Sequence, residues 1–321
     1  MIFHFVLVAA ASLSTFSAAA GAAYPERPIR ILVPFPPGGN VDITARIVAP
    51  GLSSRIGQAV IIDNRGGAHG SIAADIVAKA AHDGYTLMLT SSGMLAIAPA
   101  LYQKLSYDIG RDFAPIGSIS TVPLVMLVHQ SSPTKTVREF ITMAKSRPGR
   151  ITVATNGSGS TPDLAGALFQ SVTGTKLIAV PYKGSGPAQI DLAGGQVEVY
   201  FDQLSAAIAF VNAGKTRALA VTSKARVAQL PDVPTMGEAG VPGCEATTFT
   251  GLLAPARTPR EIIGRLNAAL NNALRMDSVR ESFARFAGQT LEGSPEELAR
   301  LMRDETAKWT QVVRAAGIKG E

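Results

Sequence analysis

The stretch Ile29-Arg-Ile-Leu-Val-Pro-Phe-Pro-Pro-Gly-Gly-Asn-Val-Asp-Ile-Thr-Ala-Arg46 decides the fold, because an apolar strand pattern stops at Pro and Gly and then resumes with helical spacing. Residues 29–33 suit a buried parallel strand, and the apolar positions from Val41 onward form one face of a helix whose predicted N-cap is Asn40. Gly38 and Gly39 let the backbone approach a ligand, and the free N–H groups of the first helical turn favour an anion there. The stretch predicts either a small carboxylate pocket or a loop that only turns the chain into its first helix.

Strand and helix patterns alternate from residue 24 onward, which predicts parallel sheets in an α/β fold. The runs 113–119 and 124–129 interrupt the alternation, because the segment Ser120-Thr-Val-Pro123 between them is too short for a crossover helix. The chain is expected to leave its first sheet there and to return along the extended run 247–254, before helices that follow Pro259. The expected strands of the first series are 29–33, 59–63 and 85–90, and those of the second are 151–154, 177–181, 197–201 and 218–222.

This order predicts two α/β lobes joined by two crossings, with loops of both lobes facing a cleft. We expect lobe 1 to be discontinuous and to comprise residues 24–121 plus 248–321, and lobe 2 to comprise residues 122–247. The third strand of the first series ends in Thr90-Ser-Ser-Gly93, at the same sheet edge as the opening glycine loop. That segment is therefore a second candidate lining of the cleft.

The first 23 residues carry no Lys, Arg, Asp or Glu, and an apolar run over residues 2–11 is followed by small residues up to Gly21-Ala-Ala23. This pattern predicts a secretory signal peptide over residues 1–23, cleaved before Tyr24, although it lacks the usual basic residue before the apolar run. The alternative is a short membrane anchor, but the apolar run is too short to span a bilayer comfortably.

Composition excludes several classes of function. The 321 residues are 46% hydrophobic, so a substantial core can form, and the net charge of +6 is scattered rather than clustered. With 6% aromatic residues and no basic stripe, a nucleic acid partner is not expected. Cys244 is the single cysteine, and the sequence has neither a phosphate-binding P-loop, a nucleophile elbow, paired histidines nor a metal-ligand set. We expect no catalytic residue, metal or cofactor.

Three acidic residues follow loops or strand ends that face the expected cleft. Asp42 and Asp163 fall in the first turns of helices, where a carboxylate stabilises the helix dipole, so capping explains them as well as ligand contact does. Asp202 ends an apolar strand and is expected near the cleft, either touching the ligand or hydrogen bonding at the hinge. Phe35 and Tyr182 lie beside prolines in loops and are candidate cleft walls, whereas Lys183 is expected to be mainly solvated.

Several short motifs are spread over nearly the whole chain after residue 23. They are Tyr24-Pro-Glu-Arg-Pro28, Val33-Pro-Phe-Pro-Pro-Gly-Gly39 with Asp42 and Ala45-Arg46, Asp83-Gly-Tyr-Thr86, Val180-Pro-Tyr-Lys-Gly184 with Pro187-Ala188, Asp191-Leu192, Gly194-Gly-Gln196 and Leu230-Pro-Asp-Val-Pro-Thr235. In these motifs the chain resembles the Bug-type (TctC-like) periplasmic solute receptors of tripartite tricarboxylate transporters. The resemblance implies a type II periplasmic-binding-protein fold, a carboxylated ligand, and two ligand-clamping loops, 34–42 and 155–161.

The function expected from the residues and the resemblance is that of a periplasmic receptor, not an enzyme. It would bind a small carboxylated molecule between its lobes and deliver it, as a monomer, to membrane transporter subunits. A ligand-dependent sensor that contacts a membrane signalling protein is one alternative, and an enzyme on the same fold is another. The candidate ligand-binding residues are Phe35, Pro36, Gly38, Gly39, Asp42, Ser91, Ser92, Thr155, Gly157, Ser158, Gly159, Ser160, Thr161, Asp163, Tyr182 and Asp202.

Two positions depart from the pattern of these receptors. Asp163 stands where they often carry His, and Asn64-Arg-Gly-Gly67 lacks a Pro usually found after Asn-Arg. With Thr161 as the predicted N-cap of its helix, the Asp163 carboxylate would compete with a ligand anion for the same N–H groups. We therefore hypothesise a preference for monocarboxylates, or for ligands whose far end is neutral or cationic. If Asp163 only supports its helix, it would have no effect on which ligand charge the protein prefers.

Overall fold

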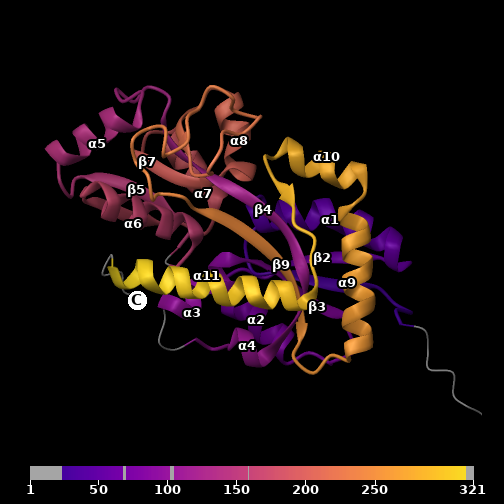
Figure 1. Cartoon of the computed structure of the whole chain (residues 1–321). Helices are drawn as coiled ribbons and strands as arrows, with labels where there is room; N and C mark the ends of the chain where they lie inside the picture. The colour runs from indigo at the N-terminus through magenta and orange to yellow at the C-terminus, as the bar shows by residue number, and fades with distance from the viewer. Residues whose placement is uncertain (1–23, 68–69, 102–104, 158, 316–321) are drawn as a thin grey trace, which may run out of the picture.

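The computed structural model describes residues 24–67, 70–101, 105–157 and 159–315, so the expected signal peptide lies outside the described residues (Figure 1). The deciding stretch folds as strand, loop and helix. Strand β1 is central to the first part of the sheet, because it pairs in parallel with both β2 and β3. The elements of this part are β1 (Ile29–Val33), α1 (Asn40–Ile56), β2 (Val60–Asn64), α2 (Ser71–Ala78) and β3 (Thr86–Ser91).

A long strand, β4 (Phe113–His129), follows three short helices, η2 (Gly93–Ile97), α3 (Ala98–Leu101) and α4 (Ile109–Asp112). The two apolar runs 113–119 and 124–129 belong to this one strand, because the chain stays extended through Ser120-Thr-Val-Pro123. These residues continue the ladder with β9 (Thr247–Pro255), and the Ser120 hydroxyl lies 2.8 Å from that of Thr250. The β-branched residues in the segment favour the same extended backbone.

The second part of the sheet is built on the other end of β4. Strands β7 and β8 pair with β4 in antiparallel fashion through its residues 124–129, and β5 lies in parallel between β6 and β7. Figure 1 shows this part separated from the first, with β4 and β9 running from one to the other. Its elements are α5 (Val137–Ser146), β5 (Ile151–Thr155), α6 (Thr161–Thr173), β6 (Leu177–Pro181), α7 (Ser185–Ala193), β7 (Val199–Gln203), α8 (Leu204–Asn212) and β8 (Thr216–Val221).

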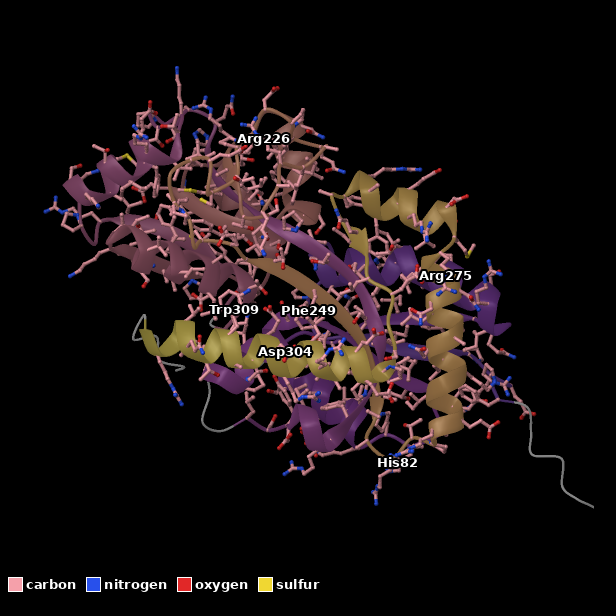
Figure 2. The ribbon with its side chains drawn as sticks, in the orientation of Figure 1. His82, Arg226, Phe249, Arg275, Asp304 and Trp309 are labelled. Carbon is pink, nitrogen blue, oxygen red and sulfur yellow. The ribbon has the colours of Figure 1, made fainter. Side chains whose placement is uncertain are left out.

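The C-terminal helices return to the first part, as expected. Helix α9 packs against α1 and β4, and α11 packs against β4, η2 and α3. Trp309 of α11 is completely buried and belongs to the same apolar cluster as Phe249 of β9, whereas Asp304 on the same helix is exposed (Figure 2). The elements are α9 (Arg260–Leu274), α10 (Asp277–Arg285), β10 (Gln289–Thr290) and α11 (Pro295–Ala315).

The strands thus form one curled, mixed sheet with helices around it, which confirms the α/β class. Its strand order over the described residues is β2-β1-β3-β9-β4-β7-β5-β6, with β10 and β8 as further partners of β4. Among those residues, none of the helices is both long and apolar enough to cross a membrane.

Candidate functional site

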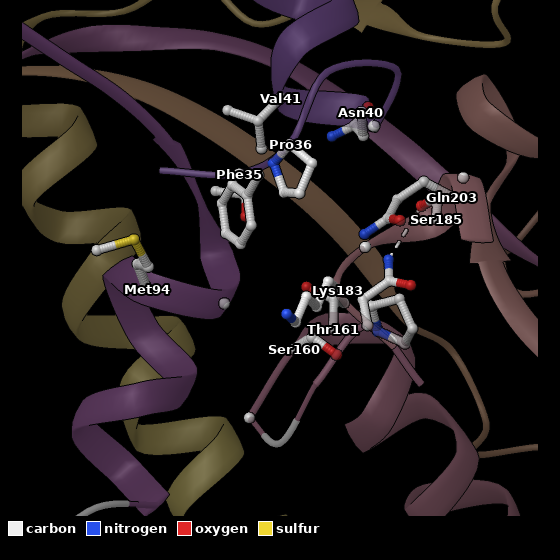
Figure 3. Close-up of a pocket in the computed structure, with 18 of the residues that line it drawn as sticks. Phe35, Pro36, Asn40, Val41, Met94, Ser160, Thr161, Lys183, Ser185 and Gln203 are labelled. Carbon is white, nitrogen blue, oxygen red and sulfur yellow. Dashed lines mark hydrogen bonds between the residues drawn. The ribbon is translucent and has the colours of Figure 1, made fainter. Parts of the chain in front are cut away.

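A cavity lies where the loops after β1, β3, β5 and β6 meet the end of β7 (Figure 3). Each of these segments follows the carboxyl end of a strand, which is where open α/β sheets bind ligands. About 790 Å³ of space between these segments is free of protein atoms, and part of it is open to solvent.

Seven of the predicted binding residues line this cavity. They come from the glycine loop before α1, from the end of β3 and from the loop before α6. They are Phe35, Pro36, Gly39, Ser91, Gly159, Ser160 and Thr161.

The other predicted residues are not in the lining. Gly38 and Gly157 lie in the same loops, and Thr155 is the last residue of β5. Ser92 lies beside the cavity, where its Oγ is 3.1 Å from Thr161 Oγ1. Ser158 lies outside the described residues. The remaining ones, Asp42, Asp163, Tyr182 and Asp202, have protein partners, which are described below.

Asp42 supports the first loop from inside the protein. Its Oδ2 accepts a 2.9 Å hydrogen bond from the Gly38 N–H, and its carboxylate also accepts bonds from Arg46 and Asn64. Burial alone would raise the pKa of the Asp42 carboxyl, but the bonds from Arg46, Gly38 and Asn64 outweigh it and lower the pKa below its usual value. Asp42 is therefore ionised at neutral pH and keeps the loop in place.

Asp163 occupies the equivalent position in the second loop. Its Oδ2 accepts a 2.9 Å hydrogen bond from the Gly159 N–H, four residues earlier, as Asp42 does from Gly38. Gly38 and Gly159 both have left-handed backbones, with φ of 86° and 74°. The two loops thus share one construction, in which a glycine N–H is turned back onto an acidic side chain of the following helix.

The predicted helix caps each differ from the structure by one residue. Ser160, not Thr161, caps α6 by accepting a 3.3 Å bond from the Asp163 N–H, and Gly39 precedes α1 in place of Asn40. The side chains of Thr161 and Asn40, which were predicted as caps, instead link the two parts of the protein. Thr161 meets Ser92, and Asn40 Oδ1 accepts a 2.8 Å bond from Ser205 Oγ. These two contacts therefore bridge the two parts of the protein beside the cavity.

Asp202 lies behind the cavity rather than in it. It is fully buried and accepts bonds from Ser185 Oγ and Gln189 Nε2, both 2.8 Å, and from the Gln203 N–H at 2.9 Å. Burial raises the pKa of the Asp202 carboxyl to about 6, although these hydrogen bonds oppose the shift. Ser185 in turn accepts a 3.0 Å bond from Asn156 Nδ2, so the buried carboxylate orients cavity-lining side chains.

Tyr182 lies outside the cavity lining, because its hydroxyl donates a 2.8 Å bond to Asp191 Oδ2. Sequence reasoning missed Asn40, Asn156, Ser185 and Gln203 as lining residues. Ser185 follows Gly184 of the family motif, and Gln203 follows the candidate residue Asp202. The alternation of side chains along a strand end was the available signal for Gln203.

Among the helix N-termini at the cavity, those of α1 and α7 follow a glycine and have no side-chain cap. Helix α1 follows Gly39 and helix α7 follows Gly184, and neither glycine can accept the first-turn N–H groups as a Ser or Asp side chain would. Both glycines line the cavity, and Lys183 beside Gly184 is the one charged side chain among the described lining residues. Uncapped N–H groups, helix dipoles and a cation together favour an anion.

No group of three or more His, Cys, Asp or Glu side chains within the described ranges could hold a metal ion. The cavity itself offers hydrogen-bond donors, one exposed amine and apolar walls such as Phe35 and Met94. Donors, a cation and apolar walls together suit the binding of a small organic anion.

The sequence matches the model of the tripartite tricarboxylate transporter family receptor over residues 44–318. The chain belongs to this receptor family. It is 39% identical to the protein BugT of Bordetella pertussis over 297 residues, which cover 92% of this chain and 91% of that protein.

Solved structures of similar proteins agree with this assignment. The R. palustris protein Rpa4515 with adipate is 38% identical, with a TM-score of 0.90, covering 92% of this chain and 99% of that one. The periplasmic binding protein BugD is 34% identical, with a TM-score of 0.88, covering 93% and 100%. MatC from Rhodopseudomonas palustris with bound malate is 34% identical, with a TM-score of 0.86, covering 90% and 100%.

Membership of this family confirms the Bug-type resemblance and the solute-receptor fold. The tripartite tricarboxylate receptors are periplasmic binding proteins, so this chain is a solute receptor rather than an enzyme.

Proposed function

We propose that this receptor captures a small organic carboxylate in the cavity and delivers it to the membrane subunits of a tripartite transporter. The observation that carries the proposal is the pair of uncapped helix N-termini, those of α1 and α7, which meet at the cavity beside Lys183. The adipate and malate in the structures of Rpa4515 and MatC support a carboxylate of this size.

The binding residues of this proposal are the predicted ones that line the cavity, joined by Asn40, Asn156, Lys183, Ser185 and Gln203. The two-lobe division into residues 24–121 plus 248–321 and residues 122–247 belongs to the same proposal. The proposal also includes export through a signal peptide and action as a monomer. Pairing along β4 supports the division, because its partners change from β9 to β7 and β8 at Pro123 and Leu124.

Isothermal calorimetry with acetate, butyrate, succinate, malate and adipate tests the ligand class, and native mass spectrometry of the purified protein identifies an acid that copurifies. We expect at least one of these carboxylates to bind, and Lys183→Gln to weaken it by about two- to fivefold, since the amine is exposed. Lys176→Gln is the matched control, because Lys176 is an exposed lysine outside the cavity. Failure of all carboxylates to bind would refute the proposed function.

The transporter partner needs its own experiment. Membrane proteins from the source cells should be captured by the immobilised receptor more strongly with saturating ligand than without it. Recovery of a signalling protein, and of no transporter subunit, would favour the sensor alternative.

A further inference from the structure

Two buried polar atoms of the cavity lining have no hydrogen-bond partner among the residues that the structure describes. Asn40 is 4% exposed and Gln203 is 6% exposed, so neither side chain is solvated. Asn40 uses its oxygen to accept from Ser205, which leaves the donor Nδ2 without a partner. Gln203 uses its nitrogen to donate to Thr248 Oγ1 at 3.2 Å, which leaves the acceptor Oε1 without a partner.

The two side chains belong to different parts of the protein. Asn40 begins α1, and Gln203 ends β7, directly before α8. Figure 3 shows both on the same side of the cavity, close to Ser185. Closure therefore brings an unpartnered donor and an unpartnered acceptor to one end of the binding space.

Closing the empty cavity removes water from these two atoms without replacing the lost hydrogen bonds, and this loss disfavours the closed state. A ligand that reaches both atoms as the cleft closes around it removes that penalty. Such a ligand has a higher affinity for the closed form than for the open one, as ligand-driven closure requires.

The chemistry of the two atoms restricts the ligand group. An ionised carboxylate only accepts hydrogen bonds, so it would satisfy Asn40 but place negative charge against Gln203 Oε1. An ammonium group only donates, so it would satisfy Gln203 alone, and an alkyl group would satisfy neither. A hydroxyl or a carboxamide both donates and accepts.

Building on the proposed function, we infer that the preferred ligand carries, besides its carboxylate, a neutral hydroxyl or carboxamide that Asn40 and Gln203 recognise. The carboxylate lies at the uncapped ends of α1 and α7, and the neutral group lies where the two amide side chains meet the cavity. This selectivity does not depend on the charge of Asp163.

Calorimetry with two matched series of probes tests the inference in the unmodified protein. The four-carbon series is butyrate, 4-hydroxybutyrate, succinate and succinamate, and the six-carbon series is hexanoate, 6-hydroxyhexanoate, adipate and adipamate. We expect, in at least one series, the hydroxyl and carboxamide members to bind about tenfold or more tightly than both the alkyl acid and the diacid. Equal affinities within both series, or tightest binding by the diacids, would overturn the inference while leaving the proposed function intact.

Gln203→Met removes the acceptor while keeping the side-chain length, and it should reduce the preference to within about twofold. Gln196→Met is the matched control, because Gln196 is an exposed glutamine that does not line the cavity. A preference that survives in a folded Gln203→Met protein would overturn the inference. If that variant does not fold, the wild-type series decides. Absence of binding by every probe would refute the proposed function and this inference with it.

Discussion

Replacement of Asp202 by Asn should remove a distinctive pH dependence from the stability of the empty receptor. The pKa of this buried carboxyl is about 6 in the folded protein, against 3.8 for an unperturbed carboxyl. The folded state therefore binds the proton more tightly than the unfolded state does. The stability contributed by this group is fully present below pH 3.8 and is lost as the pH rises through 6.

The magnitude follows from the size of the shift. A difference of about two pH units corresponds to about 3 kcal/mol of unfolding free energy, most of it lost between pH 4 and pH 7. Asn cannot ionise, so Asp202→Asn should lack this loss. The bond to Gln189 can be kept, because Gln189 Oε1 has no partner and can accept from the new amide nitrogen once the Gln189 amide turns over.

The measurement is denaturant unfolding of both proteins at pH 4, 5, 6 and 7, analysed as the difference between variant and wild type. Carboxyl groups whose pKa is lowered by folding, such as Asp42 and Asp63, have the opposite pH dependence, but they occur in both proteins and cancel. We expect the variant to gain about 2–3 kcal/mol relative to wild type between pH 4 and pH 7. A difference that stays constant over this range would show that burial does not perturb Asp202.

Three other changes test the loops and closure. Gly39→Val should abolish carboxylate binding in calorimetry yet keep the melting temperature within a few degrees. The fold should tolerate it because Gly39 has an extended backbone, and a Cβ there would meet only Pro36 O, at 3.9 Å. Unchanged affinity would show that the first loop is not part of the site. Asp163→Asn should lower the free energy of unfolding by about 1 kcal/mol, since the Gly159 N–H loses a charged acceptor. It should leave the ratio of mono- to dicarboxylate affinities unchanged, and a changed ratio would show that the Asp163 carboxylate reaches the ligand. Small-angle scattering should give a smaller radius of gyration with saturating ligand than without it, and identical profiles would argue against closure.

The local parts of the fold could be predicted from the sequence because their signals are local. Helix α5, for example, begins directly after a capping box that Thr136 and Glu139 form, a signal carried by two residues three positions apart. Strand β6 was predicted with its observed bounds. The glycine loops before α1 and α6 were recognised as cavity segments for the same reason, because glycine and proline mark strand-to-helix turns wherever they occur.

The roles of individual site residues could not be predicted in the same way. Asn is a residue type that often caps helices, but the side chain of Asn40 instead accepts a hydrogen bond from Ser205, which lies 165 residues further along the chain. Gln203 is oriented by Thr248, 45 residues away, and Asp202 by Ser185 and Gln189. These partners meet only after the sheet has formed, so nothing in the local sequence indicates which polar side chain turns toward the cavity and which turns away.

The continuity of β4 has a mechanical consequence for the receptor. One strand, Phe113–His129, is hydrogen bonded along its length to both parts of the protein, and Thr222 Oγ1 bonds to Leu124 and to the Ala246 carbonyl oxygen at the two crossings. Opening of the proposed lobes would therefore twist an intact ribbon of two strands rather than move a flexible linker. Because such a ribbon resists deformation, we expect the proposed lobes to rotate about one axis and to return to the same geometry after each opening. The amide hydrogens of β4 near Leu124 should accordingly exchange slowly with solvent in the empty and loaded receptor alike.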